Sequence, residues 1–398
     1  MKVTAVYVYP IKALGGISLK GAFVGSQGIL FDRRFMICKI QEDNTFKKMQ
    51  HSSFPHCALF EQTLLPHGFD NNPDKCTAIQ VRYHPPPAST QDGSSAPVEE
   101  DNETLQVPLH PDMATLSPVT INLHKSETKA YRMGDPYDAW FTSRFGFPVA
   151  LIYIGDGRRA VLGKSLLPPP TTAPTSKGWF STLTSLVSSS SQENPWITFT
   201  DVAPLLITSE TSLHNVSDRL SEGTYMDMYK FRPNIVVNGD GEDAFAEDFW
   251  GELTFTPAPR EHLPPEDRVS FSSTDTAEWN EEKEEAHQER MREREETRRK
   301  LAWKVLLTGN CGRCTSLNVD YKTGKQAEGE LGTVLKKLMV DRRVDKGAKW
   351  TPVFGRYGFV EGLEEGGMVG VSVGDVVEIV KRNEERSVWD WPGLGSGA

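Results

Sequence analysis

The chain begins MKVTAVYVYPIK over residues 1–12. Between Val3 and Val8 most side chains are β-branched or aromatic, which predicts a strand, and the Tyr9-Pro10 pair ends it. An amphipathic, Arg-rich presequence would look different. We therefore expect folded structure to begin at once, with no such presequence.

The same pattern recurs in short segments along the chain. We predict further strands at residues 22–24, 34–40, 57–62, 79–83, 119–123, 231–237 and 376–380. Two helices are predicted beside them, one over 136–145 with Asp135 as its N-cap and one capped by Ser209. Gly146 and Gly223 are expected to end these helices. Many short strands and few helices favour a mainly β fold with flanking helices and β-barrel-like domains.

Changes in composition divide the chain into two ordered blocks. We expect one domain at 1–148 and a second at 196–384, joined through a Pro/Ser/Thr-rich linker or loop at 165–195. A charged insertion at about 256–300 interrupts the second block. Its later part mixes both signs of charge with almost no apolar stripe, which is typical of a solvated helix or loop; the alternative is a helix that binds a partner.

Composition limits the class of protein. The 398 residues carry a formal net charge of −10, which argues against non-specific binding of nucleic acid. Five cysteines in a chain of this length do not form a disulfide framework, so a reducing compartment is expected. No apolar run approaches the roughly 20 residues of a membrane span, and no membrane anchor is visible. We expect a cytoplasmic protein, with mitochondrial association as an alternative.

The tetrapeptide Cys311-Gly312-Arg313-Cys314 places two thiols and a guanidinium close together. Such a group can hold a metal, run redox chemistry or bind an anionic cofactor. A structural zinc site needs four ligands, and the sequence offers no second CxxC pair. A thioredoxin-type dithiol begins a helix, whereas residues 319–324 predict a strand and a turn. Two plain buried thiols are the remaining interpretation.

Candidate cations lie far from this tetrapeptide. In the segment FRPNIVV at 231–237, Arg232 and Asn234 are two positions apart on the predicted strand and would share a face. The guanidinium fork suits a phosphate group. Lys12 follows the pair that ends the first predicted strand, and Arg33 follows Asp32, whose carboxylate can orient it. Each of these side chains, taken singly, is also typical of a surface cation.

Together these motifs resemble the MOSC family, in particular the two-part proteins in which a MOSC N-terminal β-barrel domain precedes a MOSC domain. The matching segments are YPIK at 9–12, DRR at 32–34, FRPNIVV at 231–237, AED at 246–248, CGRC at 311–314, VDYKTG at 319–324 and PVFGRY at 352–357. They follow the family's order along most of the chain. Within the family, the sequence is most similar to the mitochondrial amidoxime-reducing components and their bacterial counterparts.

The resemblance implies a molybdenum cofactor of the Mo-pyranopterin type. Cys314 would be the thiolate on molybdenum and the catalytic residue, because a soft ligand suits such a metal. The residues implied to contact the pterin and its phosphate are Lys12, Arg33, Arg232, Asn234, Arg313 and Tyr357. The chain departs from the family pattern at Ala13, Ser52, Ala203 and Gly312. These departures bear on substrate preference more than on cofactor binding.

The resemblance also implies an oxidoreductase that reduces small N-hydroxylated compounds. No nucleotide-binding Gly-rich loop, flavin motif or iron–sulfur Cys set is visible, so electrons would come from a b-type haem cytochrome and its NADH-dependent flavin reductase. The first alternative is a non-catalytic carrier of molybdenum cofactor or sulfur, like the C-terminal part of the molybdenum-cofactor sulfurases. Pyridoxal phosphate chemistry is not expected in so short a chain. The second alternative is a zinc or dithiol protein.

Overall fold

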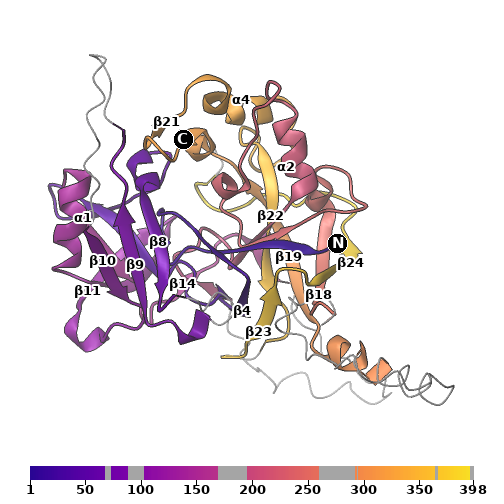
Figure 1. Cartoon of the computed structure of the whole chain (residues 1–398), viewed down its shortest axis with the longest axis horizontal. Coiled ribbons are helices and arrows are strands. Elements are labelled where there is room, and N and C mark those ends of the chain that lie inside the picture. The colour runs from indigo at the N-terminus through magenta and orange to yellow at the C-terminus, as the bar shows by residue number, and fades with distance from the viewer. Residues whose placement is uncertain are drawn as a thin grey trace, which may run out of the picture.

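The protein is described here from a computed structural model (Figure 1). The described residues are 1–67, 73–87, 103–168, 195–259, 292–293, 295–363 and 366–394. Within them strands far outnumber helices, which confirms the predicted mainly β fold with flanking helices. The predicted linker and charged insertion lie mostly outside these residues. One part of the insertion is described, where Glu295 forms an ion pair with Arg299.

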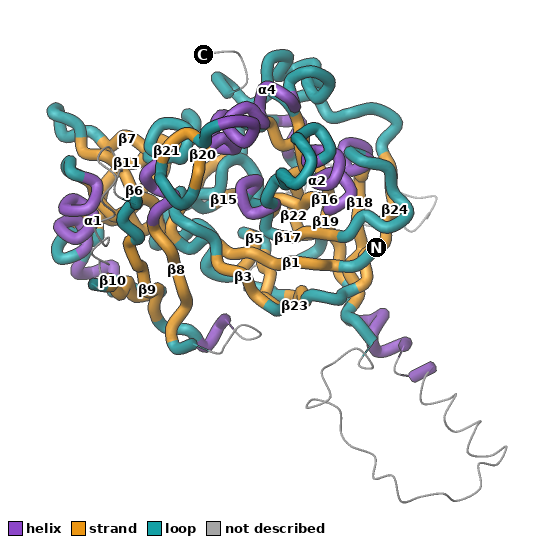
Figure 2. Tube along the Cα trace, turned by 45° about the horizontal axis from the view of Figure 1, so that its top comes forward, coloured by secondary structure: helices purple, strands orange, loops and turns teal. Residues whose placement is uncertain are grey.

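The largest sheet has eight strands and includes the first and the last strand of the chain. Its order is β24 (Val376–Arg382), β18 (Trp250–Thr256), β19 (Trp303–Gly312), β22 (Val353–Val360), β16 (Leu205–Ser209), β17 (Ile235–Val237), β1 (Val3–Val8) and β3 (Ile17–Leu19). The pair β16–β17 is parallel, whereas β1 runs antiparallel to β17. Figure 2 shows β1 lying beside β3 at this edge. The first strand of the chain is therefore part of a sheet built mainly from the second half.

A six-stranded sheet forms in the first half. It contains β11 (Ser117–Leu123), β12 (Ser126–Arg132), β13 (Val149–Tyr153), β6 (Phe35–Ile40) and β2 (Ile11–Lys12), with β7 (Phe46–Lys48) paired to β6. The three-stranded sheets are β10 (Thr104–Pro108), β9 (Ala78–Tyr83), β8 (Phe60–Leu65), and β23 (Val369–Ser372), β4 (Gly21–Gly25), β5 (Gly28–Ile29). The two-stranded pairs are β14 (Arg159–Ala160) with β15 (Trp196–Ile197), and β20 (Val319–Asp320) with β21 (Lys325–Gln326).

Helices are short and lie outside the sheets. The α-helices that lie wholly within the described residues are α1 (Tyr137–Phe145), α2 (Glu210–Ser217) and α4 (Val334–Leu338). The 3₁₀ turns are η1 (Pro55–Leu59), η2 (Pro73–Lys75), η3 (Met113–Thr115), η4 (Lys164–Leu166), η5 (Met228–Phe231), η6 (Ala246–Phe249), η9 (Thr315–Asn318) and η10 (Gly329–Thr333). Gly146 ends α1 in the left-handed conformation, as the sequence predicted. The second helix begins after Ser209, also as predicted, but ends before Asp218.

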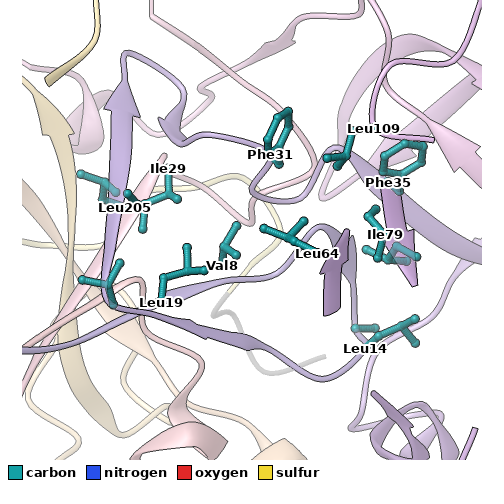
Figure 3. Close-up of a cluster of buried hydrophobic side chains, with 14 of the residues drawn as sticks. Val8, Leu14, Leu19, Ile29, Phe31, Phe35, Leu64, Ile79, Leu109 and Leu205 are labelled. Atoms are coloured by element: carbon teal, nitrogen blue, oxygen red, sulfur yellow. The ribbon is translucent and has the colours of Figure 1, made fainter. Parts of the chain in front are cut away.

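One hydrophobic core crosses from the first half of the chain to the second (Figure 3). Leu19 and Ile29 from the first half lie in the same cluster as Leu205 of β16. Full burial of such a side chain stabilises the fold by about 1.5–3 kcal/mol. The shared core holds the two halves at a fixed relation, which matters because the candidate site takes residues from both.

Two predicted strands begin at least three residues before the observed ones. Within the predicted strand 57–62, the 3₁₀ turn η1 occupies the first residues and β8 begins only at Phe60. Within 231–237 the strand β17 begins at Ile235, because Arg232 has a φ of 55° and ends η5 in the left-handed region. The missing backbone N–H of Pro233 also prevents regular pairing there.

Candidate functional site

One cavity gathers every residue that the sequence proposed for the site. Its lining includes the predicted set Lys12, Arg33, Arg232, Asn234, Arg313, Cys314 and Tyr357. The first two come from β2 and the turn after β5, and the others come from segments around β17, β19 and β22. The cavity therefore lies where the first half of the chain meets the second.

The two cysteines of the CxxC motif lie in different environments. Cys314 follows the end of β19 and is the N-cap residue of η9; its thiol is exposed and lies 3.1 Å from the hydroxyl of Ser316. Cys311 is buried on β19, and its Sγ lies 3.1 Å from the hydroxyl of Tyr357. Burial raises the pKa of the Cys311 thiol. Only Cys314 therefore offers an accessible sulfur to a ligand in the cavity.

Two guanidinium groups lie on the ring of a buried tyrosine. The Cζ atoms of Arg33 and Arg232 are 4.5 Å and 4.3 Å from the ring centre of Tyr9. The hydroxyl of Tyr9 donates to the carbonyl of Pro233 at 3.0 Å, which fixes the ring. Cation–π contact of this kind holds guanidinium groups in place. Arg33 is in addition paired with the buried carboxylate of Asp32. The sequence analysis gave no role to Tyr9, although it quoted the residue as a strand breaker.

The positive charge of Arg232 is not matched by a carboxylate within the residues described. Its Nη1 donates to the carbonyl of Leu14 at 2.8 Å, whereas its Nη2 is buried without a hydrogen-bond partner of good geometry. Nε2 of His51, which also lines the cavity, is buried and unpartnered in the same way. Burial and the charge of Arg232 hold the pKa of His51 well below its usual value. An anionic group in the cavity would accept from Nη2 of Arg232.

On another wall the buried amino group of Lys12 is linked to Asp201, whose side chain is partly exposed, and through it to His124. Nζ of Lys12 lies 2.5 Å from Oδ1 of Asp201, which also accepts from Nε2 of His124 at 3.2 Å. Burial lowers the pKa of Lys12 to about 8. Burial alone would raise the pKa of Asp201, but Lys12 and His124 hold it well below its usual range. Asp201 therefore stays ionised beside Lys12.

Arg313 and Asn234 mainly fix backbone segments that form the cavity walls. Arg313 donates through Nε to the carbonyl of Phe354 at 2.8 Å and through Nη1 to the carbonyl of Phe231 at 2.7 Å. The side-chain oxygen of Asn234 accepts from the backbone N–H of Leu206 at 3.1 Å. The polar atoms of both side chains are therefore largely used by the protein. They place the walls of the cavity and leave fewer donors for a ligand than the sequence suggested.

Sequence reasoning missed several residues of the cavity. These are Gln50, His51, Thr200, Asp201, Lys230 and Ser316. None of them stands in a motif of known chemistry, and their role depends on which segments meet in space. Only the neighbours of the quoted motifs, Lys230 beside 231–237 and Ser316 beside 311–314, carried a signal that could have found them.

Family models match most of the chain. Residues 1–148 match the family described as MOSC N-terminal beta barrel domain, and residues 194–378 match the family described as MOSC domain. Within the described residues, no group of three or more His, Cys, Asp or Glu side chains is arranged to hold a metal ion. Cys314 therefore belongs to no such group in this part of the chain.

Curated relatives match over a short segment. The mitochondrial amidoxime reducing component 2 of Homo sapiens is 44% identical over 61 residues, which cover 15% of this chain and 17% of the relative. The same protein of Macaca fascicularis matches equally, and human component 1 is 44% identical over 57 residues, 14% of this chain and 16% of the relative. The matched segment thus spans about a sixth of these relatives. Among the described helices, none is long and apolar enough to cross a membrane.

Proposed function

Because the chain is a MOSC-domain protein with a MOSC N-terminal β-barrel domain, we propose that it binds a Mo-pyranopterin cofactor in this cavity and acts as an oxidoreductase. Names of the relatives point to amidoxime reduction, and we propose small N-hydroxylated compounds as substrates. The observation that carries the proposal is the combination of an exposed Cys314 thiol with the unmatched Arg232 guanidinium in one cavity.

The donor set fits the parts of this cofactor. Cys314 would ligate molybdenum through its sulfur, which suits a soft metal site. Lys12, Arg33 and Arg232 would hold the anionic end, with the two guanidiniums kept in place by Tyr9. When bound, the cofactor supplies the two-electron redox chemistry. The chain itself positions the group, shields it on two walls and keeps positive charge beside it.

The proposed reaction balances with an external electron supply. An amidoxime takes up two electrons and two protons, its N–O bond breaks, and an amidine and water leave. We propose that the electrons come from NADH through a flavin reductase and a b-type haem cytochrome, since the relatives are named as components. A cytoplasmic location, with mitochondrial association as the alternative, stays a prediction.

Metal analysis and turnover test the proposal together. Protein purified from a host that makes the cofactor is expected to hold about one molybdenum per chain and to reduce benzamidoxime with a reconstituted electron chain. Cys314→Ser is expected to lose reduction, whereas Cys76→Ser, a thiol outside the cavity, keeps it. Absence of molybdenum and pterin would overturn the proposal. Bound cofactor without reduction of any N-hydroxylated compound would favour the carrier function.

A further inference from the structure

A second cavity lies directly beside the first and shares the wall that contains Cys314. Gln50, Asp201, Gly312, Arg313, Cys314 and Tyr357 line both. The second cavity has a volume of about 280 Å³, just below the ~300–1,000 Å³ typical of small-molecule sites. The exposed sulfur of Cys314 therefore lies on the wall that the second cavity shares with the first, whose cations suit an anion.

The outer wall of the second cavity comes from the end of the chain. Trp389 and Leu394 line it, and both follow the last strand, β24. They also lie beyond residue 378, where the match to the MOSC domain ends. The indole N–H of Trp389 donates to the carbonyl of Leu394 at 2.7 Å, so the two residues form one folded unit. We call residues 387–394 the C-terminal wall.

Several bonds attach the C-terminal wall to the body of the protein. Trp391 is buried, and its indole N–H donates to the carbonyl of His124 at 2.8 Å. The carboxylate of Asp390 accepts from the hydroxyl of Ser165 at 2.7 Å and from its backbone N–H at 3.0 Å. The backbone N–H of Trp389 donates to Asp345 at 2.9 Å. The wall is thus a fixed boundary of the cavity.

The second cavity has a polar side and an apolar side. Lys48, His124 and Asp201 line the polar side and are linked to one another: Nζ of Lys48 lies 3.0 Å from Nδ1 of His124, whose Nε2 lies 3.2 Å from Asp201. Trp389 and Leu394 contribute apolar surface to the lining. The ring centres of Trp389 and Tyr357 are 6.4 Å apart. A ligand with a small polar head and a flat apolar body matches this division.

We propose that this second cavity is the substrate site and that Trp389 of the C-terminal wall selects N-hydroxylated compounds with a planar aromatic body. The inference rests on the proposed function, since it takes Cys314 as the place of the metal. The N–OH group of the substrate would lie toward Cys314, and the amino group of the same amidoxime would lie toward Asp201. The aromatic ring of the substrate would lie against the indole of Trp389. The C-terminal wall is a specificity element added to the part of the chain that matches the MOSC family.

Selectivity between two amidoximes tests the role of Trp389. Benzamidoxime has an aromatic ring and acetamidoxime has a methyl group in its place. In Trp389→Ala we expect the ratio of their kcat/KM values, benzamidoxime over acetamidoxime, to fall about tenfold. Trp389→Phe should keep most of the ratio, and Trp196→Ala, which removes an indole outside both cavities, should leave it unchanged. An unchanged ratio in Trp389→Ala at full molybdenum content would overturn the proposal.

A binding measurement separates this proposal from the proposed function. The indole ¹⁵N–¹H signal of Trp389, assigned by its loss in Trp389→Phe, is followed in wild-type holoprotein without an electron donor. Benzamidoxime is expected to shift this signal saturably, and acetamidoxime is expected to leave it in place. A saturable shift without any turnover would support the site while the proposed function fails. Turnover of benzamidoxime without a shift of the Trp389 signal would contradict the proposed substrate site while the proposed function stands.

Discussion

Chemistry at the residue scale depends on exposure as much as on residue type. Cys311 and Cys314 are three positions apart, yet one contacts the hydroxyl of Tyr357 in the core and the other is exposed. The same holds for the cations: Lys12 is paired with Asp201, whereas Arg232 has a buried Nη2 with no partner of good geometry in the described structure. Their different surroundings give residues of one type different functions.

The thiols should differ in reactivity. With a thiol reagent at pH 8, the native cofactor-free protein is expected to be labelled once, at Cys314. The other four cysteines are buried, and burial raises the pKa values of Cys38 and Cys57 to about 12. Peptide mass spectrometry identifies the labelled residue, and cofactor loading should protect it. Labelling of Cys311 at a comparable rate would contradict the buried position of that thiol.

Arg232 should control cofactor retention. Arg232→Ala removes a charged donor that has no partner in the cavity, and a charged hydrogen bond contributes about 1.5–3 kcal/mol. We therefore expect the cofactor to bind roughly 10- to 100-fold more weakly, measured as molybdenum per chain after dialysis. Arg34→Ala is the matched control, because Arg34 lies outside the cavity and donates to the carbonyl of Gly155. Equal loss in both variants would point to a general defect of folding.

At the scale of elements, the turn η6 joins the large sheet to the segments behind it. The carboxylate of Asp248 accepts from Arg342 at 2.8 Å through both oxygens and from Arg386 at 2.8 Å. Its neighbour Glu247 is buried and accepts from the hydroxyl of Ser212 at 2.7 Å. The AED motif that carried part of the family resemblance therefore acts in the structure as a buried polar connection between elements.

Glu247 should make stability depend on pH. Burial raises its pKa from 4.5 to about 7, so the folded state holds a proton that the unfolded state releases. The resulting stabilisation is present below about pH 4.5 and is lost as the pH rises through 7. Between pH 5 and pH 8, the free energy of unfolding of Glu247→Gln should fall less than that of the wild type, by up to about 3 kcal/mol.

Urea unfolding at the two pH values measures this difference. Glu385→Gln is the matched control, because Glu385 is exposed and its substitution should leave the pH dependence of stability as in wild type. The same pH dependence in wild type and Glu247→Gln would contradict a buried, protonated Glu247.

At the scale of the whole molecule, strands from the two matched family regions pair with each other. β1 pairs with β17, and β4 pairs with β23, so these two strands belong to sheets that the second half completes. The N-terminal amino group also donates to the carbonyl of Val377 at 3.0 Å, which places the N-terminus beside β24 (Figure 1). The cavity around Cys314 lies between these interlocked halves.

Unfolding should therefore be cooperative across the chain. Because the halves share a core and two strand pairings, calorimetry is expected to show one thermal transition, and its midpoint should rise when the cofactor binds. A fragment of residues 1–148 lacks the partners of β1 and β4, so it should show a weak and broad circular dichroism transition. Two separate transitions in the whole chain would show that the halves fold independently.

The sequence by itself determined which segments form strands wherever a local pattern was strong. β1 has the predicted bounds, and α1 ends at Gly146, because alternation, β-branching and a left-handed glycine act over a few residues. It also proposed the seven site residues, through motifs in family order rather than through any one residue. The sequence did not predict the backbone conformation at Arg232. Its φ is 55°, and its side chain contacts Tyr9 and Leu14, which belong to a distant segment.

The tertiary structure alone decided which side chains share a site. His51, Asp201 and Trp389 carry no motif, and they reach the region of Cys314 because non-local strand pairs and one core fix the segments that hold them. Desolvation and pairing, which set the pKa of Lys12 and leave Arg232 unmatched, are properties of that arrangement. Local sequence fixes backbone preference, whereas burial and charge balance arise only once distant segments pack together.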